Sequence, residues 1–407
     1  MDKVETYKGL VDANPLVKNI ISFEMADKIF GNNDFTVSQL SPIWKANLEK
    51  NLKLYKKHGS FAEAFRGYGK GKAVIAVGAG PSFNKNKHIL KKVYELNCQF
   101  PVEKQPFIIF SSNKMFKPLL EMGIYPHFTL LIDSGEALYP QLCEKIPTWA
   151  AKSILVTGLH TSHKILSKWN RRGGEICFYL IGEQEEKDFF KEKTKEDPNF
   201  IHIDQGGSVV NTMWILSHRF LDSEVFIPIG NDLGFKHSGD KKEREKSFYS
   251  VGDYRTNILN KRDEAKSNLA WMGYDLYESR IVPGQLMFDL MPMGISGQLW
   301  ISKAWLEVQA TLWADQKSFK ILNASEAGTL GVLYKSFEPG AMGKRDNCYL
   351  IDELIPNHWE TTTLARACKK FVEVKKCQEE ILMGIAGDAR NVIYSPEKTV
   401  GARTIGL

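Results

Sequence analysis

KAVIAVGAGPSFNKN, residues 72 to 86, joins a short apolar run to a glycine turn. The apolar run from Ala73 to Val77 predicts a buried strand, and KHILKKVYEL, which begins at Lys87, predicts a helix after the turn. Glycines let the backbone approach a ligand, and the first N–H groups of a helix have no partner within it. A turn of this kind can therefore bind a phosphate or carboxylate.

Two better-known phosphate motifs do not match the residues of this turn. A Walker A loop ends in Gly-Lys-Ser/Thr, which is missing, and the dinucleotide fingerprint has a third glycine where this chain has Phe83. The alternative is an ordinary strand-to-helix turn whose glycines serve backbone geometry alone.

Composition indicates a globular chain with room for a large core. The 407 residues are 43% hydrophobic and 25% charged, which suits one large α/β domain with additions, or two domains. The net charge of +6 is small for this length and spread along the chain, so we expect a mildly basic surface and no nucleic acid partner. That charge is equally compatible with anionic small-molecule substrates.

Cysteine spacing and hydropathy point to the cytoplasm. The six cysteines are far apart and form no CxxC pair, so we expect reduced thiols and neither a zinc site nor a disulfide framework. The first 20 residues lack the apolar core of a signal sequence, and no stretch approaches the roughly 20 apolar residues of a transmembrane helix. Any membrane contact would be peripheral.

Alternating strand and helix patterns predict an α/β fold, a Rossmann-like, doubly wound, mostly parallel sheet with helical N- and C-terminal extensions. Further strands are expected at Phe107 to Phe110, His127 to Asp133, Ser153 to Gly158 and Glu175 to Gly182. The expected units are a helical extension at 1–66, a nucleotide-binding transferase domain at 67–335 with a polar insertion at 236–268, and a helical extension at 336–407.

In such a sheet the ligand lies at the carboxyl ends of the strands. This rule singles out the turn after the first strand, the Ser-Ser-Asn that ends at Asn113, Asp133, and the Gly-Asn-Asp that ends at Asp232. A second glycine turn, Gly206, Gly207 and Ser208, precedes a predicted helix and offers another anion-receptive helix start. We expect the two glycine turns to face one cavity.

The ordered series GAGPS (78–82), SSN (111–113), Asp133, GGSVVNT (206–212), IPIGNDLGF (227–235) and ILNASEAG (321–328) resembles a known family. It is similar, over about residues 45 to 335, to the domain shared by motility accessory factor glycosyltransferases and 6-hydroxymethylpterin diphosphokinases. A more distant similarity is to bacterial sialyltransferases that use CMP-sialic acid. The resemblance implies a nucleotide- and donor-binding pocket formed by Gly78, Ala79, Gly80, Pro81, Ser82, Asn113, Gly206, Gly207, Ser208, Asn323 and Ser325.

The resemblance leaves two activities open. A glycosyltransferase would pass an acidic sugar from a CMP-linked donor to a protein or small-molecule acceptor, with no metal required. His237 is then the candidate base, although it could equally be a solvated loop histidine. A diphosphokinase would use ATP and Mg²⁺, with Asp133 and Asp232 as candidate catalytic carboxylates, although either could instead cap a turn.

A third hypothesis is a non-catalytic nucleotide-binding or assembly protein on the same fold. Retention of all the turns together argues for a working pocket. The helical ends could also support a homo-oligomer.

Overall fold

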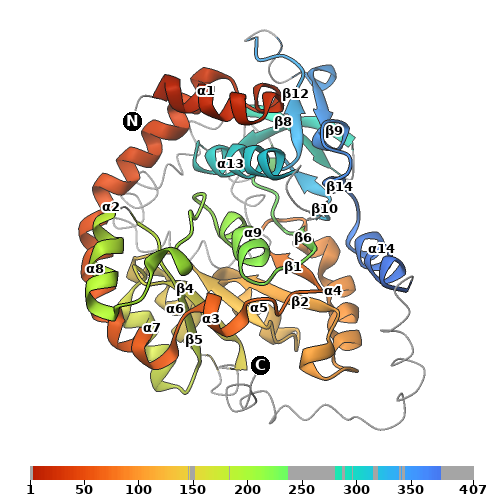
Figure 1. The fold of residues 1–407 in the computed structure, drawn as a ribbon. Helices are drawn as coiled ribbons and strands as arrows, with labels where there is room; N and C mark the ends of the chain where they lie inside the picture. Colours follow the sequence, from red (N-terminus) through yellow and green to blue (C-terminus); the bar gives the residue numbers. More distant parts are fainter. Residues whose placement is uncertain are drawn as a thin grey trace.

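The computed structural model describes residues 3–144, 146, 152–182, 184–236, 280–286, 289–295, 297–314, 320–338, 341 and 344–376. At its centre lies an eight-stranded parallel sheet with the strand order β14-β10-β6-β1-β2-β3-β4-β5 (Figure 1). The strands are β1 (Ala73–Val77), β2 (Phe107–Ser112), β3 (Phe128–Leu131), β4 (Ile154–Gly158), β5 (Ile176–Tyr179), β6 (Val225–Ile229), β10 (Lys320–Asn323) and β14 (Trp359–Thr361).

The sheet is doubly wound, as the sequence predicted. From β1 the chain builds outward through β2, β3 and β4 to β5, then returns to the other side of β1 and continues through β6, β10 and β14. The direction of winding therefore reverses between β1 and β6. In open α/β sheets this is the usual place for a ligand.

Helices cover both faces of the sheet because alternate residues of each buried strand point to opposite sides. Ile75 and Val77 of β1 share a core with Leu90 of α4, whereas Val74 and Ala76 share a core with Met213 of α9. The helices that follow the strands are α4 (Phe83–Asn97), α5 (Asn113–Glu121), α6 (Tyr139–Cys143), α7 (His163–Arg171), α8 (Gln184–Thr194), α9 (Val209–Arg219) and α14 (Leu364–Lys376).

The expected N-terminal helical extension is confirmed by α1 (Lys3–Ala13), α2 (Phe23–His58) and α3 (Phe61–Phe65). The C-terminal part is helical in α14, but β14, which precedes it, joins the central sheet beside β10. The sequence did not indicate this strand because it is three residues long, too short for alternation to show. The domain boundaries themselves stay a prediction.

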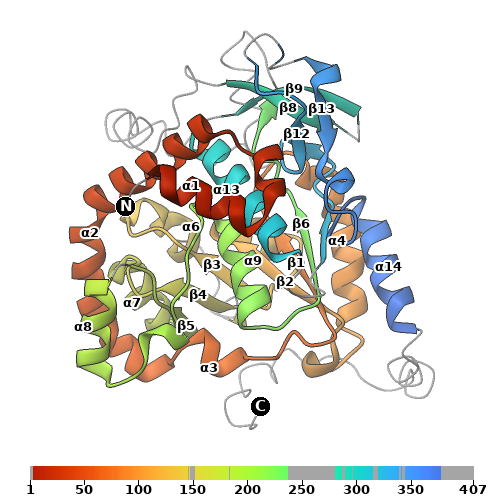
Figure 2. The same ribbon diagram turned by 45° about the horizontal axis from the view of Figure 1, so that its top comes forward.

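A second, antiparallel sheet was also not expected. It has the order β11-β8-β9-β7 and lies above the central sheet, close to α13 (Gly297–Trp313), in Figure 2. Its strands are β7 (Phe235–Lys236), β8 (Arg280–Leu286), β9 (Asp289–Ile295) and β11 (Ala327–Gly328). Of the insertion proposed at 236–268, only residue 236 belongs to the described residues.

A short antiparallel β-ribbon pairs β12 (Val332–Tyr334) with β13 (Cys348–Leu350).

In the part of the chain that the structure describes, no helix is long and apolar enough to cross a bilayer. The five described cysteines are free thiols.

Candidate functional site

The carboxyl ends of the parallel strands form one edge of the central sheet, and this edge has two parts. We call the turns after β1, β6 and β10 the β1/β6 half, and the turns after β2, β3, β4 and β5 the β2/β5 half. The sequence placed candidate residues in both halves.

In the β1/β6 half, the glycines of the first turn pack directly against the end of β6. The Gly80 N–H donates to the Gly230 carbonyl over 2.6 Å. A Cβ on Gly78 would lie 2.2 Å from Asn231 Oδ1, and one on Gly80 would lie 2.6 Å from Asp232 Cγ. Close packing between two strand ends therefore explains both glycines in this arrangement.

Asp232 occupies the start of α4. The Ser82 N–H donates to Asp232 Oδ2 over 2.9 Å, and the Ser82 hydroxyl donates to Oδ1 of the same carboxylate. Burial raises the pKa of Asp232 to about 7, although the Ser82 hydrogen bonds and the Lys85 charge act against that rise. The position predicted for a ligand's phosphate thus holds a carboxyl group of the protein itself.

The turn after β10 is also filled from within. The Asn323 amide donates to the Leu330 carbonyl over 3.0 Å, and the Ser325 hydroxyl accepts from the Asn231 N–H over 3.2 Å. The Glu326 carboxylate accepts a hydrogen bond from the backbone of Leu364, the first residue of α14. Asn323 and Ser325, which the resemblance places in the nucleotide- and donor-binding pocket, are here part of an internal hydrogen-bond network.

In the β2/β5 half, the turn after β2 contains a buried polar group that is not satisfied from within the described chain. Ser112 is the N-cap residue of α5, and its buried hydroxyl has no hydrogen-bond partner within the described part of the chain. The Asn113 amide donates to Gln141 Oε1 over 2.6 Å. The sequence prediction thus placed Asn113 correctly after the second strand, but missed the contact with α6.

Asp133 follows β3 and is partly buried. Burial raises the pKa of its carboxyl group, and the positive charge of Lys114 on α5 lowers it. The same carboxylate contributes to a raised pKa of Tyr179 at the end of β5, whose hydroxyl accepts from Gln205 Nε2 over 2.6 Å. The sequence analysis did not predict Lys114, Tyr179 and Gln205 as site residues. The only signal in the sequence for them was their position close to the ends of predicted strands.

His160, after β4, is a buried neutral imidazole. Its Nε2 donates to the Ile132 carbonyl over 2.9 Å, so Nδ1 carries the lone pair, and burial lowers the pKa of the ring to about 4. Nδ1 has no hydrogen-bond partner among the residues that the structure describes, and the same holds for the hydroxyl of the neighbouring Thr161.

Helix α2 fixes the loops of this half. The Asn47 amide donates to the carbonyls of Ser134, over 3.3 Å, and His160, over 3.0 Å. The Asn51 amide donates to the carbonyls of Leu159, over 2.9 Å, and Thr161, over 2.8 Å. The N-terminal extension is thus a structural part of this edge.

The second glycine turn packs against α13. The Ser208 hydroxyl accepts from the Asn211 N–H over 3.3 Å and so caps α9. Gly206 has a φ of 64°, and a Cβ there would lie 2.4 Å from a ring carbon of Trp305. Gly207 lies beside it with a φ of 76°.

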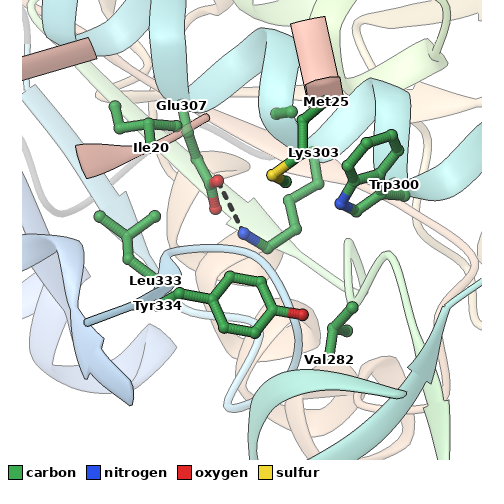
Figure 3. A pocket seen from close by; sticks show the side chains of 9 residues that line it. Ile20, Met25, Val282, Trp300, Lys303, Glu307, Leu333 and Tyr334 are labelled. Carbon is green, nitrogen blue, oxygen red and sulfur yellow. Dashed lines mark hydrogen bonds and ion pairs between the residues drawn. The ribbon is translucent and has the colours of Figure 1, made fainter. Parts of the chain in front are cut away.

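Two hollows in the described residues lie away from these turns. One is enclosed by α13, β12 and the start of α2, where Lys303 points at Glu307 across 2.7 Å (Figure 3). The other lies near Asn14 and His358. The cavity expected between the two glycine turns therefore stays a prediction.

The predicted catalytic residues are not gathered at one point. His237 lies outside the described residues. Asp133 and Asp232 follow β3 and β6, which are three strand spacings apart, or about 14 Å. Within the described ranges, no group of three His, Cys, Asp or Glu side chains is arranged to hold a metal ion.

A comparison with known families confirms the predicted resemblance to the 6-hydroxymethylpterin diphosphokinases. Residues 46–238 match the family described as 6-hydroxymethylpterin diphosphokinase MptE-like. A solved structure, the MAf glycosyltransferase from Magnetospirillum magneticum AMB-1, aligns with 16% identity and a TM-score of 0.41 over 64% of this chain. The alignment spans 32% of that protein, about a third of its length. No curated protein matches.

Proposed function

We propose that this chain is a glycosyltransferase that binds a nucleotide-linked acidic sugar, with CMP as the nucleotide, at the β2/β5 half of the carboxyl edge. One observation carries the proposal. Ser112, His160 and Thr161 each keep a buried polar atom without a partner among the described residues. Buried polar atoms are nearly always hydrogen-bonded in folded proteins, so these groups favour a polar ligand rich in hydroxyl and phosphate oxygens.

The reaction needs a proton acceptor and stabilisation of a departing phosphate. The acceptor's hydroxyl oxygen forms a bond to the anomeric carbon of the sugar while the bond from that carbon to the phosphate oxygen breaks, and CMP leaves. The hydroxyl proton passes to a carboxylate. Asp133 fits this role because its burial raises the pKa toward the value of a useful base.

Neighbouring groups complete the proposed site. Lys114 adds positive charge near the leaving phosphate, where it is most effective in a site shielded from water. His160 Nδ1 is an acceptor suited to a sugar hydroxyl, whereas its pKa of about 4 makes it a weak base. The earlier candidate base, His237, is retained as the alternative proton acceptor.

The second candidate is an ATP-dependent diphosphokinase, which the description of the matched family favours. In that reaction the Asp133 carboxylate would bind Mg²⁺ together with the ATP phosphates. Asp232 follows β6, which is three strands away from β3, and its carboxyl group is hydrogen-bonded to Ser82, so this arrangement does not bring it to the same ion.

Thermal unfolding with different nucleotides tests the proposal. Ligand at about 100 times its dissociation constant stabilises the folded state by about 2.7 kcal/mol, which raises the melting temperature measurably. Stabilisation by CMP supports the glycosyltransferase, and stabilisation by ATP with Mg²⁺ alone supports the diphosphokinase. If no nucleotide stabilises the protein, both activities are contradicted and the non-catalytic assembly protein is left.

A further inference from the structure

The helices that begin at the carboxyl edge differ in what covers their first turn. The side chain of Asp232 covers the start of α4, and that of Glu326 covers the start of α14. At α9 the Ser208 hydroxyl accepts from the third residue of the helix. At α7 the N-cap residue, Ser162, makes no side-chain cap hydrogen bond, and the first residue of the helix, His163, is hydrogen-bonded through Nδ1 to the side chain of Asn51 over 2.8 Å.

Helix α5 also lacks a side-chain cover in the described chain, and the buried hydroxyl of its N-cap residue has no partner there. Its N-cap residue, Ser112, has extended backbone angles, φ −69° and ψ 154°, that suit capping, yet its hydroxyl accepts no hydrogen bond from the first turn. The side chain is only 5% exposed, and its oxygen has no partner among the described residues. A serine in this position is normally satisfied, so the hydroxyl at this helix start indicates a missing hydrogen-bond partner.

The positive charge around Ser112 indicates that the missing hydrogen-bond partner is an anion. The N-terminus of a helix carries about half a positive charge, and α5 is long enough, at nine residues, to develop it. Lys114, the second residue of α5, adds a full positive charge whose field is felt at Asp133. Asn113 is held in place by Gln141. An anion with acceptor oxygens therefore matches this position.

We infer that the phosphate of the donor nucleotide binds at the first turn of α5, where the Ser112 hydroxyl donates to a phosphate oxygen. The inference rests on the proposed function and moves the phosphate away from the glycine turns at 78–82 and 206–208. At the start of α4 the Asp232 carboxyl group already occupies the equivalent position.

Calorimetric titration of the full chain with CMP, with ATP and Mg²⁺, and with cytidine tests the inference. Ser112→Ala removes one charge-assisted hydrogen bond and should lower the affinity for phosphate-bearing nucleotides about tenfold or more. Ser112→Asp places a carboxylate at the start of α5, as Asp232 does at α4, and should abolish CMP and ATP binding. Neither change should alter the affinity for cytidine, which has no phosphate.

Ser223→Ala is the matched control. Ser223 is also 5% exposed, and its hydroxyl donates to the Lys72 carbonyl at the opposite edge of the sheet. The affinity of the Ser223→Ala variant for CMP should equal that of the wild type. Urea unfolding of each variant checks that it is folded, and if Ser112→Asp does not fold, Ser112→Ala decides the question.

The remaining outcomes separate the two proposals. If CMP binds the wild type and Ser112→Ala leaves that affinity unchanged, the inference is wrong, while the binding of CMP still supports the glycosyltransferase. If Ser82→Ala or Ser208→Ala weakens CMP binding instead, the donor phosphate binds at a glycine turn and not at the first turn of α5. If none of the nucleotides binds the wild type, both are wrong.

Discussion

The two halves of the carboxyl edge use the same kinds of residue in different ways. In the β1/β6 half, Ser82 and Asp232 satisfy each other and Asn323 is bonded to the backbone, although Lys85 Nζ on α4 has no partner in the described chain. In the β2/β5 half, Ser112 and His160 keep polar atoms without a partner in the described chain. Serine, asparagine and aspartate after a strand therefore indicate a binding site only where the protein does not provide their partners.

The largest expected effect tests the β2/β5 half as a catalytic site. Asp133→Asn removes the proposed proton acceptor and should lower turnover by about 10²- to 10⁴-fold, with nucleotide affinity retained. The measurement is steady-state glycosyl transfer together with calorimetric nucleotide binding. Asp232→Asn is the matched change in the other half, and an equal loss of turnover there would remove the distinction between the halves.

The second prediction concerns the pH dependence of stability from Asp232. Its pKa is about 7 in the folded state and about 4 in the unfolded chain, so both states hold the proton below pH 4. Between about pH 4 and pH 7 the unfolded chain releases the proton and the folded protein keeps it, so stability falls as pH rises.

Urea unfolding at pH 5 and pH 7 measures this dependence. The wild type should lose up to about 2–3 kcal/mol relative to Asp232→Asn over that interval. Parallel pH curves for the two proteins would show that Asp232 is not held in the buried contact with Ser82.

The third prediction compares one glycine from each half. Gly80→Ala places a Cβ 2.6 Å from Asp232 Cγ and should destabilise the protein by about 1–3 kcal/mol, because the strand ends cannot separate without losing their hydrogen bonds. Gly135, after β3, has no atom within 4 Å of an added Cβ and a φ of −82°, so Gly135→Ala should change stability by about 0.5 kcal/mol or less. Chemical denaturation compares them, and similar losses would contradict tight packing at Gly80.

The smallest expected effect tests how α2 supports the β2/β5 half. Asn51→Ala removes two hydrogen bonds to the loop carbonyls of Leu159 and Thr161 and a third to His163 Nδ1, and should cost about 1–2 kcal/mol. Hydrogen exchange should become faster at 158–162 and stay unchanged in the turn at 78–82. Unchanged exchange in both loops would show that α2 does not hold this half.

Much of the fold could be predicted because its signals are local. The apolar runs of β1, β2 and β4 and the turns after them identify a doubly wound parallel sheet without any knowledge of distant contacts. The antiparallel sheet was missed because β8 and β9 contain Pro283, Pro292 and two glycines, which weaken a strand pattern. Its pairings are set by contacts between segments, which no short window contains.

The sequence by itself determined the sheet, the position of its carboxyl edge and the polar residues that stand there. Only the tertiary structure decided which of those residues have partners. Ser82 and Asp232 are 150 positions apart, and they meet because β1 and β6 are neighbours in the sheet. Whether a residue has a partner matters because these residues are buried: a polar atom shielded from water must be hydrogen-bonded by the chain or by a ligand.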